Sequence, residues 1–194
     1  MAGCDIATDS TTKAKSLNDQ FQRAFSKSVP MKLQHIAEQA TKGQASGGCY
    51  PSMPPINITV AGVEKLLSKL NPYKAPGPNN LQPRILRELS CQIAPVLCNT
   101  FKVSLRTGTV PDDWKLANVT PIHKKGSRQL PEKYRPVSLT CICCKLMEHI
   151  LVSRISKHLD RYGILNDSQY GFMRAQSCET QLIAFIDDLA KEMQ

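Results

Sequence analysis

Cationic side chains gather in one stretch of the sequence, where Lys124, Lys125 and Arg128 surround Gly126 and Arg135 follows a few residues later. Ammonium and guanidinium groups bind phosphate oxygens well, the first as a compact charge and the second as a planar fork of donors. The chemistry that this cluster favours is therefore phosphate binding. A solvated basic loop without a ligand is equally compatible with these residues, because charged loops are common on protein surfaces.

Two short runs with strand character must position this cluster. Val119, Pro121 and His123 alternate before it, and a second run, residues 134–139, follows it. Alternation on both sides of a turn-rich polar segment predicts a β-hairpin. The cationic segment then forms the tip of this hairpin.

Helical periodicity dominates the chain before the hairpin. Residues 11–29 are predicted to form an amphipathic helix within an N-terminal arm, residues 1–40, and residues 41–55 are rich in Gly, Ser and Pro, which is typical of a linker. Thr59 is predicted to cap the next helix, and Pro83 to begin helical sequence that continues to a C-cap at Gly108. The residues expected to be buried on these helices are Val63, Leu66, Leu67, Leu70, Ile85, Leu86, Leu89, Ile93, Val96, Leu97, Phe101 and Leu105.

Two more helices are predicted after the hairpin, and the single tryptophan, Trp114, is expected to pack where the helices meet the hairpin. The first helix ends at Gly163, and Ser177 is predicted to cap the second. Their apolar faces comprise Leu146, Met147, Ile150, Leu151, Ile155, His158 and Leu159 in the first, and Leu182, Phe185, Ile186 and Leu189 in the second. The predicted fold class is α+β and mainly helical, with a small antiparallel hairpin and an N-terminal helical arm.

The composition is that of an ordinary globular protein, with 194 residues, 41% hydrophobic and 21% charged. The net charge of +9 favours a polyanionic partner, since spread positive charge binds phosphate polymers through counterion release. A protein that is merely basic remains the alternative. No run approaches the roughly 20 apolar residues of a membrane-spanning helix, and the N-terminus lacks the features of a signal peptide. We therefore expect an intracellular protein without a membrane partner.

The eight cysteines are scattered and do not form a disulfide-framework pattern. Cysteines and histidines recur near the hairpin, as they would in a zinc site, but their spacing differs from that of zinc fingers and ribbons. Small buried hydrophobic residues are the better interpretation, and no metal site is predicted. The residues concerned are Cys141, Cys143, Cys144, Cys178, His149 and His158.

Four segments in order carry a resemblance to a known family. They read LNPYKAPGPNN, VPDDWKLANVTPIHKKG, YRPVSLTCICCKLMEHIL and LNDSQYGFMRAQSCETQL. Together they resemble the fingers region of reverse transcriptases from non-LTR, LINE-type retrotransposons, notably the jockey and CR1-like groups. The resemblance covers residues 56–194, and LNDQFQRAF at 17–25 is similar to the arm that precedes the polymerase in such proteins. It implies an incomplete fingers subdomain that is truncated before the palm.

The resemblance also implies roles for particular residues. The fingers hairpin of that family closes over the incoming deoxynucleotide, so Lys124, Lys125 and Arg135 are expected to contact its triphosphate. A second group is expected to lie near the template strand, where a glycine lets backbone approach nucleic acid closely. This group comprises Gln169, Gly171, Phe172 and Arg174, together with Lys74 in the proline-rich loop.

The sequence departs from the family pattern at three places. Family members usually have arginine directly after Gly-Phe and a basic residue before the serine, whereas Met173 and Gln176 occupy these positions. Asn79 stands where the Pro-Asp pair of the family has its aspartate. Arg174 is displaced by one residue, which would point its side chain to the opposite face of an extended segment. The chain resembles a partly decayed copy of the element.

No catalytic residue is predicted in the chain. The family's chemistry requires two Mg²⁺ ions held by palm aspartates, and the resemblance places the first of these just beyond the last predicted helix. Asp187 and Asp188 follow Phe185 and Ile186 as in the catalytic aromatic-x-Asp-Asp signature, but helical spacing leaves them on the polar side. Asp112-Asp113, after Pro111, is expected to serve a turn.

The resulting expectation is a fragment of an RNA-directed DNA polymerase that retains binding sites for nucleotide and template but is inactive alone. RNA template, DNA primer and deoxynucleotide are the expected partners of the parent enzyme. A stand-alone basic module that binds nucleic acid, or a non-functional remnant of such an element, are the alternatives. Self-association is also expected, because residues 182–189 would have no palm to cover them.

Overall fold

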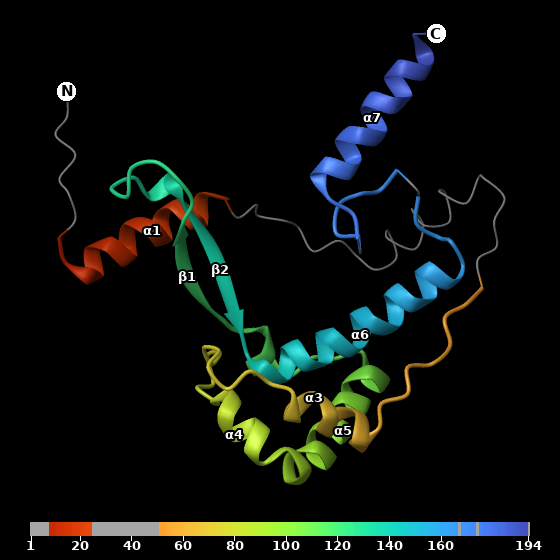
Figure 1. Cartoon of the computed structure of the whole chain (residues 1–194). Coiled ribbons are helices and arrows are strands. Elements are labelled where there is room, and N and C mark those ends of the chain that lie inside the picture. The colour runs from red at the N-terminus through yellow and green to blue at the C-terminus, as the bar shows by residue number, and fades with distance from the viewer. Residues whose placement is uncertain (1–7, 25–50, 167, 174, 194) are drawn as a thin grey trace. The chain divides into compact units, whose positions relative to one another are not determined.

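A computed structural model describes residues 8–24, 51–166, 168–173 and 175–193 of the chain. The described chain is mainly helical with one two-stranded antiparallel sheet, which confirms the α+β expectation (Figure 1). The chain divides into two compact units, residues 1–47 with 56–150, and residues 48–55 with 151–194. The elements in order are α1 (Ser10–Ala24), α3 (Val60–Ser68), α4 (Pro83–Glu88), α5 (Ser90–Thr107), η2 (Asp112–Lys115), β1 (Ala117–His123), η3 (Pro131–Lys133), β2 (Tyr134–Thr140), α6 (Ile142–Arg161) and α7 (Cys178–Glu192).

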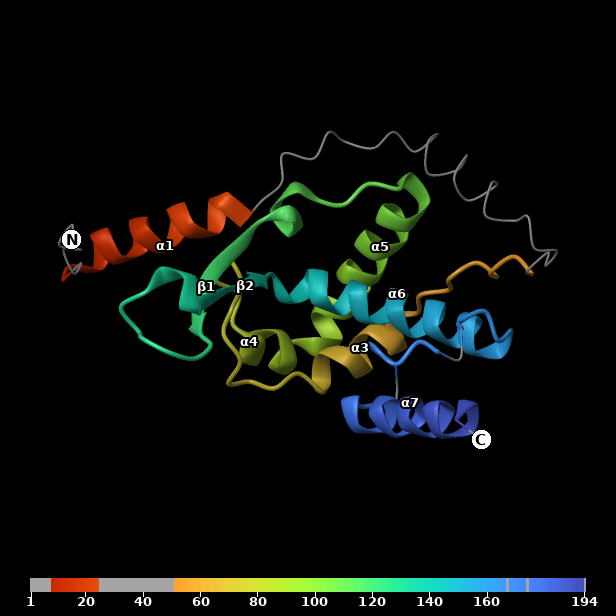
Figure 2. The ribbon, with the colours of Figure 1, turned by 90° about the horizontal axis from the view of Figure 1, so that it is seen from above.

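The core of the first unit lies between α3 and α5 and extends to the first turns of α6 (Figures 1 and 2). Thr59 caps α3 as predicted, since its hydroxyl accepts a hydrogen bond of 3.2 Å from the Gly62 N–H. Pro83 occupies the first position of α4 and Gly108 the left-handed C-cap of α5, so these two predictions are also confirmed. The buried apolar residues of this core are Ile58, Val63, Leu67, Leu86, Ala94, Leu97, Cys98, Phe101, Cys141, Ile142, Cys143, Leu146 and Met147.

The predicted apolar stripe of residues 83–108 is wrong at three positions. Ile85, Leu89 and Val96 are exposed, Val96 to 67%. The backbone leaves helical geometry at Leu89, which separates α4 from α5. On α5 the predicted Leu97 and Phe101 are buried, and they share their face with Ala94 and Cys98, so Val96 lies beside the buried stripe.

The hairpin forms as predicted, with β1 antiparallel to β2 and Thr120 opposite Val137 in the register. Trp114 in η2 precedes β1 and makes an edge-to-face contact with Phe101 of α5, 5.6 Å between ring centroids. The expected position of the tryptophan, between helices and hairpin, is confirmed. Most hairpin side chains are exposed on both faces, because no second sheet packs on them within the described residues.

Helix α6 begins directly after β2, and its last ordered turn ends before Gly163, which has a left-handed φ of 56°. Its start is stabilised by a hydrogen bond of 3.3 Å from the Cys144 N–H to the Cys141 sulfur. The buried side chains of α6 lie in its first turns. Ile155, which was predicted to be buried, is exposed. Periodicity identifies residues that share a helix face, but neighbouring elements decide how far along the helix that face is covered.

In the second unit, α7 begins with a capping box in which Ser177 and Thr180 satisfy each other's backbone N–H groups. The predicted cap is confirmed, and the apolar face of the helix is exposed, as expected for residues 182–189 without a palm to cover them. Phe185 is 60% exposed, and the rest of its apolar face, Leu182, Ile186 and Leu189, is exposed as well. Among the described residues of this unit, no other helix or strand packs extensively on α7.

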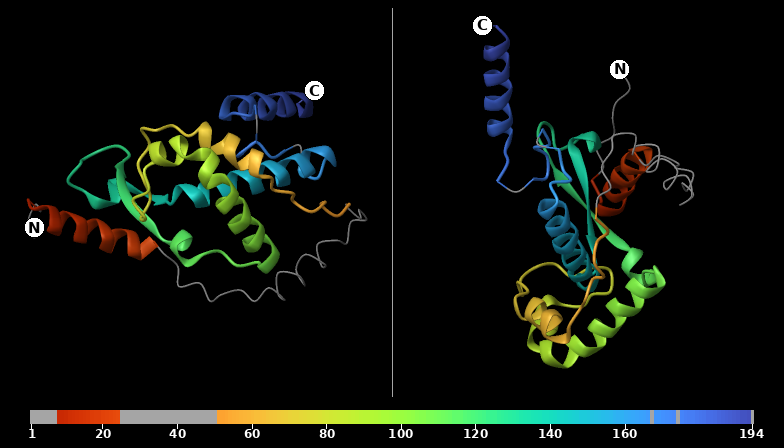
Figure 3. Two further views of the ribbon diagram at one scale, coloured as in Figure 1. Left: turned by 90° about the horizontal axis from the view of Figure 1, so that it is seen from below. Right: turned by 90° about the vertical axis from the view of Figure 1, so that its right-hand side faces the viewer.

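The N-terminal arm contains helix α1, which belongs to the first unit and contacts η3 (Figure 3). The predicted helix extended to residue 29, but residues 25–29 lie outside the described part of the chain, as do residues 41–50 of the predicted linker. Residues 51–55 have no regular secondary structure. The division of the chain into arm, linker and fingers-like region remains a prediction.

Candidate nucleotide and nucleic-acid interface

The hairpin tip, residues 124–133, is held by a set of short-range hydrogen bonds. The Lys124 N–H donates to the Lys133 carbonyl at 2.8 Å and so extends the ladder beyond the strands. The Tyr134 hydroxyl donates to the Arg128 carbonyl at 2.9 Å. Gly126 turns the chain with a φ of 84°, a conformation that glycine adopts without steric cost. The tip is therefore a defined loop in this structure.

An aromatic pair closes the base of the tip. His123 and Tyr134 are opposite each other in the register, and their rings meet edge to face with centroids 5.3 Å apart. The His123 Nε2 also lies 3.1 Å from the Gly126 carbonyl oxygen. Because neighbouring residues of a strand alternate between faces, Ile122 and Arg135, the next cross-strand pair, occupy the face opposite to these rings.

The cations of the tip are exposed, and none forms an ion pair within the described residues, where the pairs join Lys115 or Lys191 to aspartates. Lys124, Lys125 and Arg135, the predicted triphosphate contacts, thus lie on one hairpin. Lys133 was missed by the sequence prediction, although it lies directly across the ladder from Lys124. The signal that could have identified Lys133 is the register of the hairpin, because the turn fixes which residue lies opposite Lys124. Unpaired cations on an ordered loop can bind phosphate groups.

The proline-rich loop packs against the joint between β2 and α6. A Cβ on Gly77 would lie 2.5 Å from the Cys141 Cα and 2.6 Å from the Thr140 carbonyl oxygen. Only glycine fits at this contact, because both neighbours are backbone atoms. Lys74 lies in the same loop and is exposed, as predicted. The loop thus connects Lys74 to the base of the hairpin through Gly77.

Apart from Lys74, the predicted template contacts belong to the second unit. Gln169 and Gly171 are exposed, and Phe172 is fully exposed with a left-handed φ of 61°. A Cβ on Gly171 would meet no atom within 4 Å, so packing within the chain does not require glycine there. Arg174 lies outside the described residues. The role of this group stays a prediction.

The two Asp-Asp pairs have structural surroundings that differ from a catalytic turn. Asp187 and Asp188 lie within α7, where Lys191 pairs with Asp187 at 2.6 Å and approaches Asp188 at 3.8 Å. Asp112 lies in η2, and a hydrogen bond and ion pair from Lys115 at 2.7 Å lower the pKa of its carboxyl. The described residues contain no cluster of three or more potential metal ligands.

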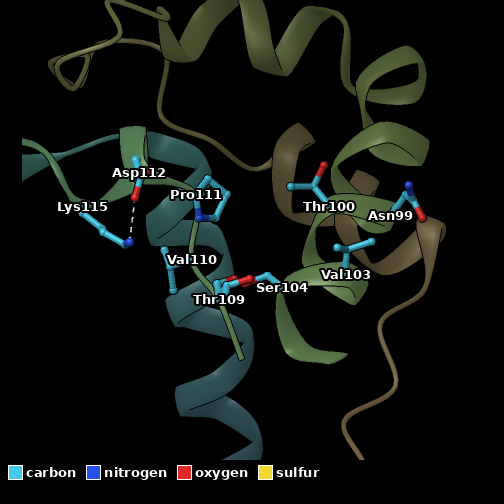
Figure 4. Close-up of a pocket in the computed structure, with 9 residues that line it drawn as sticks. All are labelled: Asn99, Thr100, Val103, Ser104, Thr109, Val110, Pro111, Asp112 and Lys115. Carbon is cyan, nitrogen blue, oxygen red and sulfur yellow. Dashed lines mark hydrogen bonds and ion pairs between the residues drawn. The ribbon is translucent and has the colours of Figure 1, made fainter. Parts of the chain in front are cut away.

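A shallow hollow of about 540 Å³ lies between the C-terminal half of α5 and the following loop (Figure 4). Several of its polar groups are paired within the chain: the Ser104 hydroxyl donates to the Thr109 carbonyl at 2.6 Å, and Lys115 pairs with Asp112. No reactive side chain is free there among the described residues. The lining residues are Asn99, Thr100, Val103, Ser104, Thr109, Val110, Pro111, Asp112 and Lys115.

Some of the cysteines are buried, which supports their interpretation as small apolar residues, and others are exposed. Cys141 and Cys143 are buried, as is Cys98, whereas Cys91 and Cys178 are exposed. Burial raises the pKa of the Cys143 thiol to about 11. Such a thiol remains protonated at neutral pH and is a poor nucleophile and metal ligand.

Comparison with known proteins points to polymerases of mobile elements. A probable RNA-directed DNA polymerase from transposon BS of Drosophila melanogaster is 31% identical over 132 residues, 68% of this chain and 15% of the relative. The RNA-directed DNA polymerase from mobile element jockey of the same species is 33% identical over 132 residues, 68% of this chain and 14% of the relative. A probable RNA-directed DNA polymerase from transposon X-element, also from this species, is 28% identical over 154 residues, 78% of this chain and 17% of the relative.

No protein-family model matches the chain. The three relatives nevertheless belong to the same class of protein: each is an RNA-directed DNA polymerase from a mobile element. The chain belongs to the reverse transcriptases of non-LTR retrotransposons, in the group that includes jockey. Its matched segment spans about one sixth of the length of these relatives or less.

None of the described helices combines the length and apolar character that a membrane crossing requires.

Proposed function

We propose that this chain supplies the fingers part of an RNA-directed DNA polymerase, which binds the incoming deoxynucleotide and the template strand. The observation that carries this proposal is the ordered hairpin tip with exposed cations that no described carboxylate neutralises. Lys124, Lys125 and Arg135 act as the triphosphate contacts in this proposal, and Lys133 joins them. Lys74, Gln169, Gly171, Phe172 and Arg174 are the proposed contacts to nucleic acid.

Binding to an RNA–DNA primer-template at several salt concentrations tests the role of the tip. Each neutralised phosphate contributes about 0.7 to 0.9 to the slope of log affinity against log salt. Lys124→Ala/Lys125→Ala should reduce that slope by roughly 1 to 2 if both side chains bind phosphate. A matched control is Lys65→Ala/Lys69→Ala, which removes the same charge from an exposed part of α3 and its C-cap.

The second candidate, a module that binds nucleic acid by net charge alone, predicts equal effects for the two double variants. This candidate is favoured by the net charge of +9. A loss confined to the tip variant supports the fingers proposal, and equal losses contradict it. A third candidate, a non-functional remnant, predicts no salt-dependent binding by the unsubstituted chain.

The proposal includes the absence of polymerase chemistry in these 194 residues. Mg²⁺ would be held by palm aspartates of the complete polymerase, where it stabilises the attacking and leaving oxygens. The helical positions of Asp187 and Asp188 support this view, since a catalytic pair requires a tight turn between strands. Incubation with Mg²⁺, primer-template and deoxynucleotides should give no extension. Extension that survives repurification of the chain would contradict this part of the proposal.

Self-association through the apolar face of α7 is also part of the proposal. Leu182, Phe185, Ile186 and Leu189 expose a continuous helical stripe. Exposed apolar stripes of this kind favour association because contact removes them from water. RNA template, DNA primer and deoxynucleotide are the proposed partners of the parent polymerase.

A further inference from the structure

Helix α1 contacts the hairpin tip although more than a hundred residues separate them in the sequence. The contact joins α1 to η3, the short 3-10 helix within the tip (Figure 3). Phe21 is 7% exposed and is the one buried side chain among the described residues of the arm. Burial of a phenylalanine stabilises a contact by roughly 1.5 to 3 kcal/mol. Phe21 is therefore the side chain of α1 that is removed from water, and its burial stabilises the position of the helix.

The contacted element, η3, forms one side of the tip. The Lys133 N–H at its end donates to the Leu130 carbonyl at 3.1 Å, and the Lys133 carbonyl accepts from the Lys124 N–H at 2.8 Å. The aliphatic stem of Lys133 lies beside Gly126. A displacement of η3 would thus move Lys133. It would also move Lys124, whose backbone N–H is hydrogen-bonded to the Lys133 carbonyl.

The hairpin has little other support. Val119 and Ile122 of β1 are 48% and 49% exposed, and Val137 of β2 is exposed as well. A two-stranded hairpin alone is marginally stable in water, and packing against a helix or further strand is what stabilises it. Of the helices that the structure describes, α1 is the one in appreciable contact with η3.

We propose that α1 is a positioning element for the hairpin tip, and that Phe21 holds η3 so that Lys124 and Lys133 keep the geometry in which they bind phosphate. This inference rests on the proposed role of the tip in phosphate binding. Its structural part, that the arm orders the tip, can be measured without any ligand. Phe21 is a positioning residue, since it acts through η3 and not on the phosphate.

Amide hydrogen exchange on the full chain tests the structural part. Phe21→Ala should make the amides of residues 124–134 exchange at least several-fold faster, while peptides from α3 and α5 keep their protection. Phe21→Leu preserves an apolar side chain and should restore slow exchange. Gln22→Ala, an exposed neighbour on the same helix, serves as the matched control.

Two exchange results would overturn the inference. One is unchanged exchange at the tip in Phe21→Ala, and the other is equal acceleration in α3, α5 and the tip, which would indicate general destabilisation. Affinity for the primer-template provides the functional readout. Phe21→Ala should weaken binding in the unsubstituted chain but add no further loss in a Lys124→Ala/Lys133→Ala background, which lacks both cations that η3 positions, a coupling that a purely structural role would not produce.

The two proposals fail in distinguishable ways. If Phe21→Ala made the tip exchange faster but left the affinity unchanged, the phosphate-binding role of the tip would be contradicted. The arm would remain the structural support of the tip. Unchanged exchange at the tip with reduced affinity in Lys124→Ala/Lys125→Ala would overturn the role of the arm and leave the proposed function intact.

Discussion

At the scale of single residues, Gly77 is a position where the backbone of one motif closely approaches that of another. Its missing side chain lets the proline-rich loop lie against the Thr140 carbonyl and Cys141. The contact joins segments more than sixty residues apart. A glycine in a motif is often explained by its backbone conformation, but Gly77 has no left-handed φ, and close approach is the reason for it.

Gly77→Ala should destabilise the folded chain by roughly 1 to 3 kcal/mol, since the new methyl group forces the loop away from the β2–α6 joint. Urea unfolding followed by circular dichroism measures this loss. Gly171→Ala is the control, because a Cβ there meets no neighbour within 4 Å. Equal stability of Gly77→Ala and the unsubstituted chain would show that the loop does not pack as closely as described.

Buried thiols give a second residue-scale prediction. Burial raises the pKa of Cys143 from its ordinary value of 9.0 to about 11. The thiol proton of Cys143 therefore dissociates at lower pH in the unfolded chain than in the folded chain. The stability that the protonated thiol contributes is present below pH 9 and is lost as pH rises toward about 11. Desolvation likewise raises the pKa of Cys144.

The measurement is the free energy of unfolding between pH 8 and 10.5, compared between the unsubstituted chain and Cys143→Ala. The variant should show a smaller decrease with pH because it lacks the titrating group. Parallel pH profiles would mean that Cys143 titrates alike in the folded and unfolded chain.

At the scale of elements, local signals set where helices begin and end. The Thr59 cap, Pro83 at the start of α4, Gly108 after α5 and the Ser177 capping box all act within one helical turn of their own position. The break at Leu89 has no comparable signal, because the apolar residues continue across it. Short-range capping is therefore visible in the sequence, while a change of helix axis depends on packing.

Thr59→Ala should lower stability by about 1 kcal/mol, because the Gly62 N–H loses its hydroxyl partner. Thr59→Ser keeps the hydroxyl and should remain close to the unsubstituted chain. Thermal unfolding of the three proteins gives the comparison. A loss as large in Thr59→Ser as in Thr59→Ala would point to the threonine methyl group instead of the cap.

At the scale of the whole molecule, the described residues form one core, in the first unit, and an exposed apolar helix in the second. The core is built by α3, α5 and the start of α6, and the hairpin extends from it. The buried residues thus do not include the stripe on α7. Water contact along that stripe is unfavourable, so a second copy that covered it would lower the free energy.

Gel filtration and analytical ultracentrifugation should show concentration-dependent association of the chain. Phe185→Ser/Ile186→Ser removes the largest apolar side chains of the α7 stripe and should shift the protein toward monomer, while the capping box remains intact. Leu81→Ser/Ile85→Ser, on exposed apolar positions of the first unit, is the control. A clean monomer of the unsubstituted chain at all concentrations would exclude this association.

The sequence by itself determined the features that depend on neighbours along the chain: the helical periods, the caps, the hairpin with its cationic tip, and the family. Only the tertiary structure decided which faces are covered, as Ile85 and Val96 demonstrate by their exposure. It also decided the contacts of Gly77 with Cys141 and of α1 with η3. The reason is physical, since capping and periodicity act within a few residues, whereas burial depends on elements that approach from distant parts of the chain.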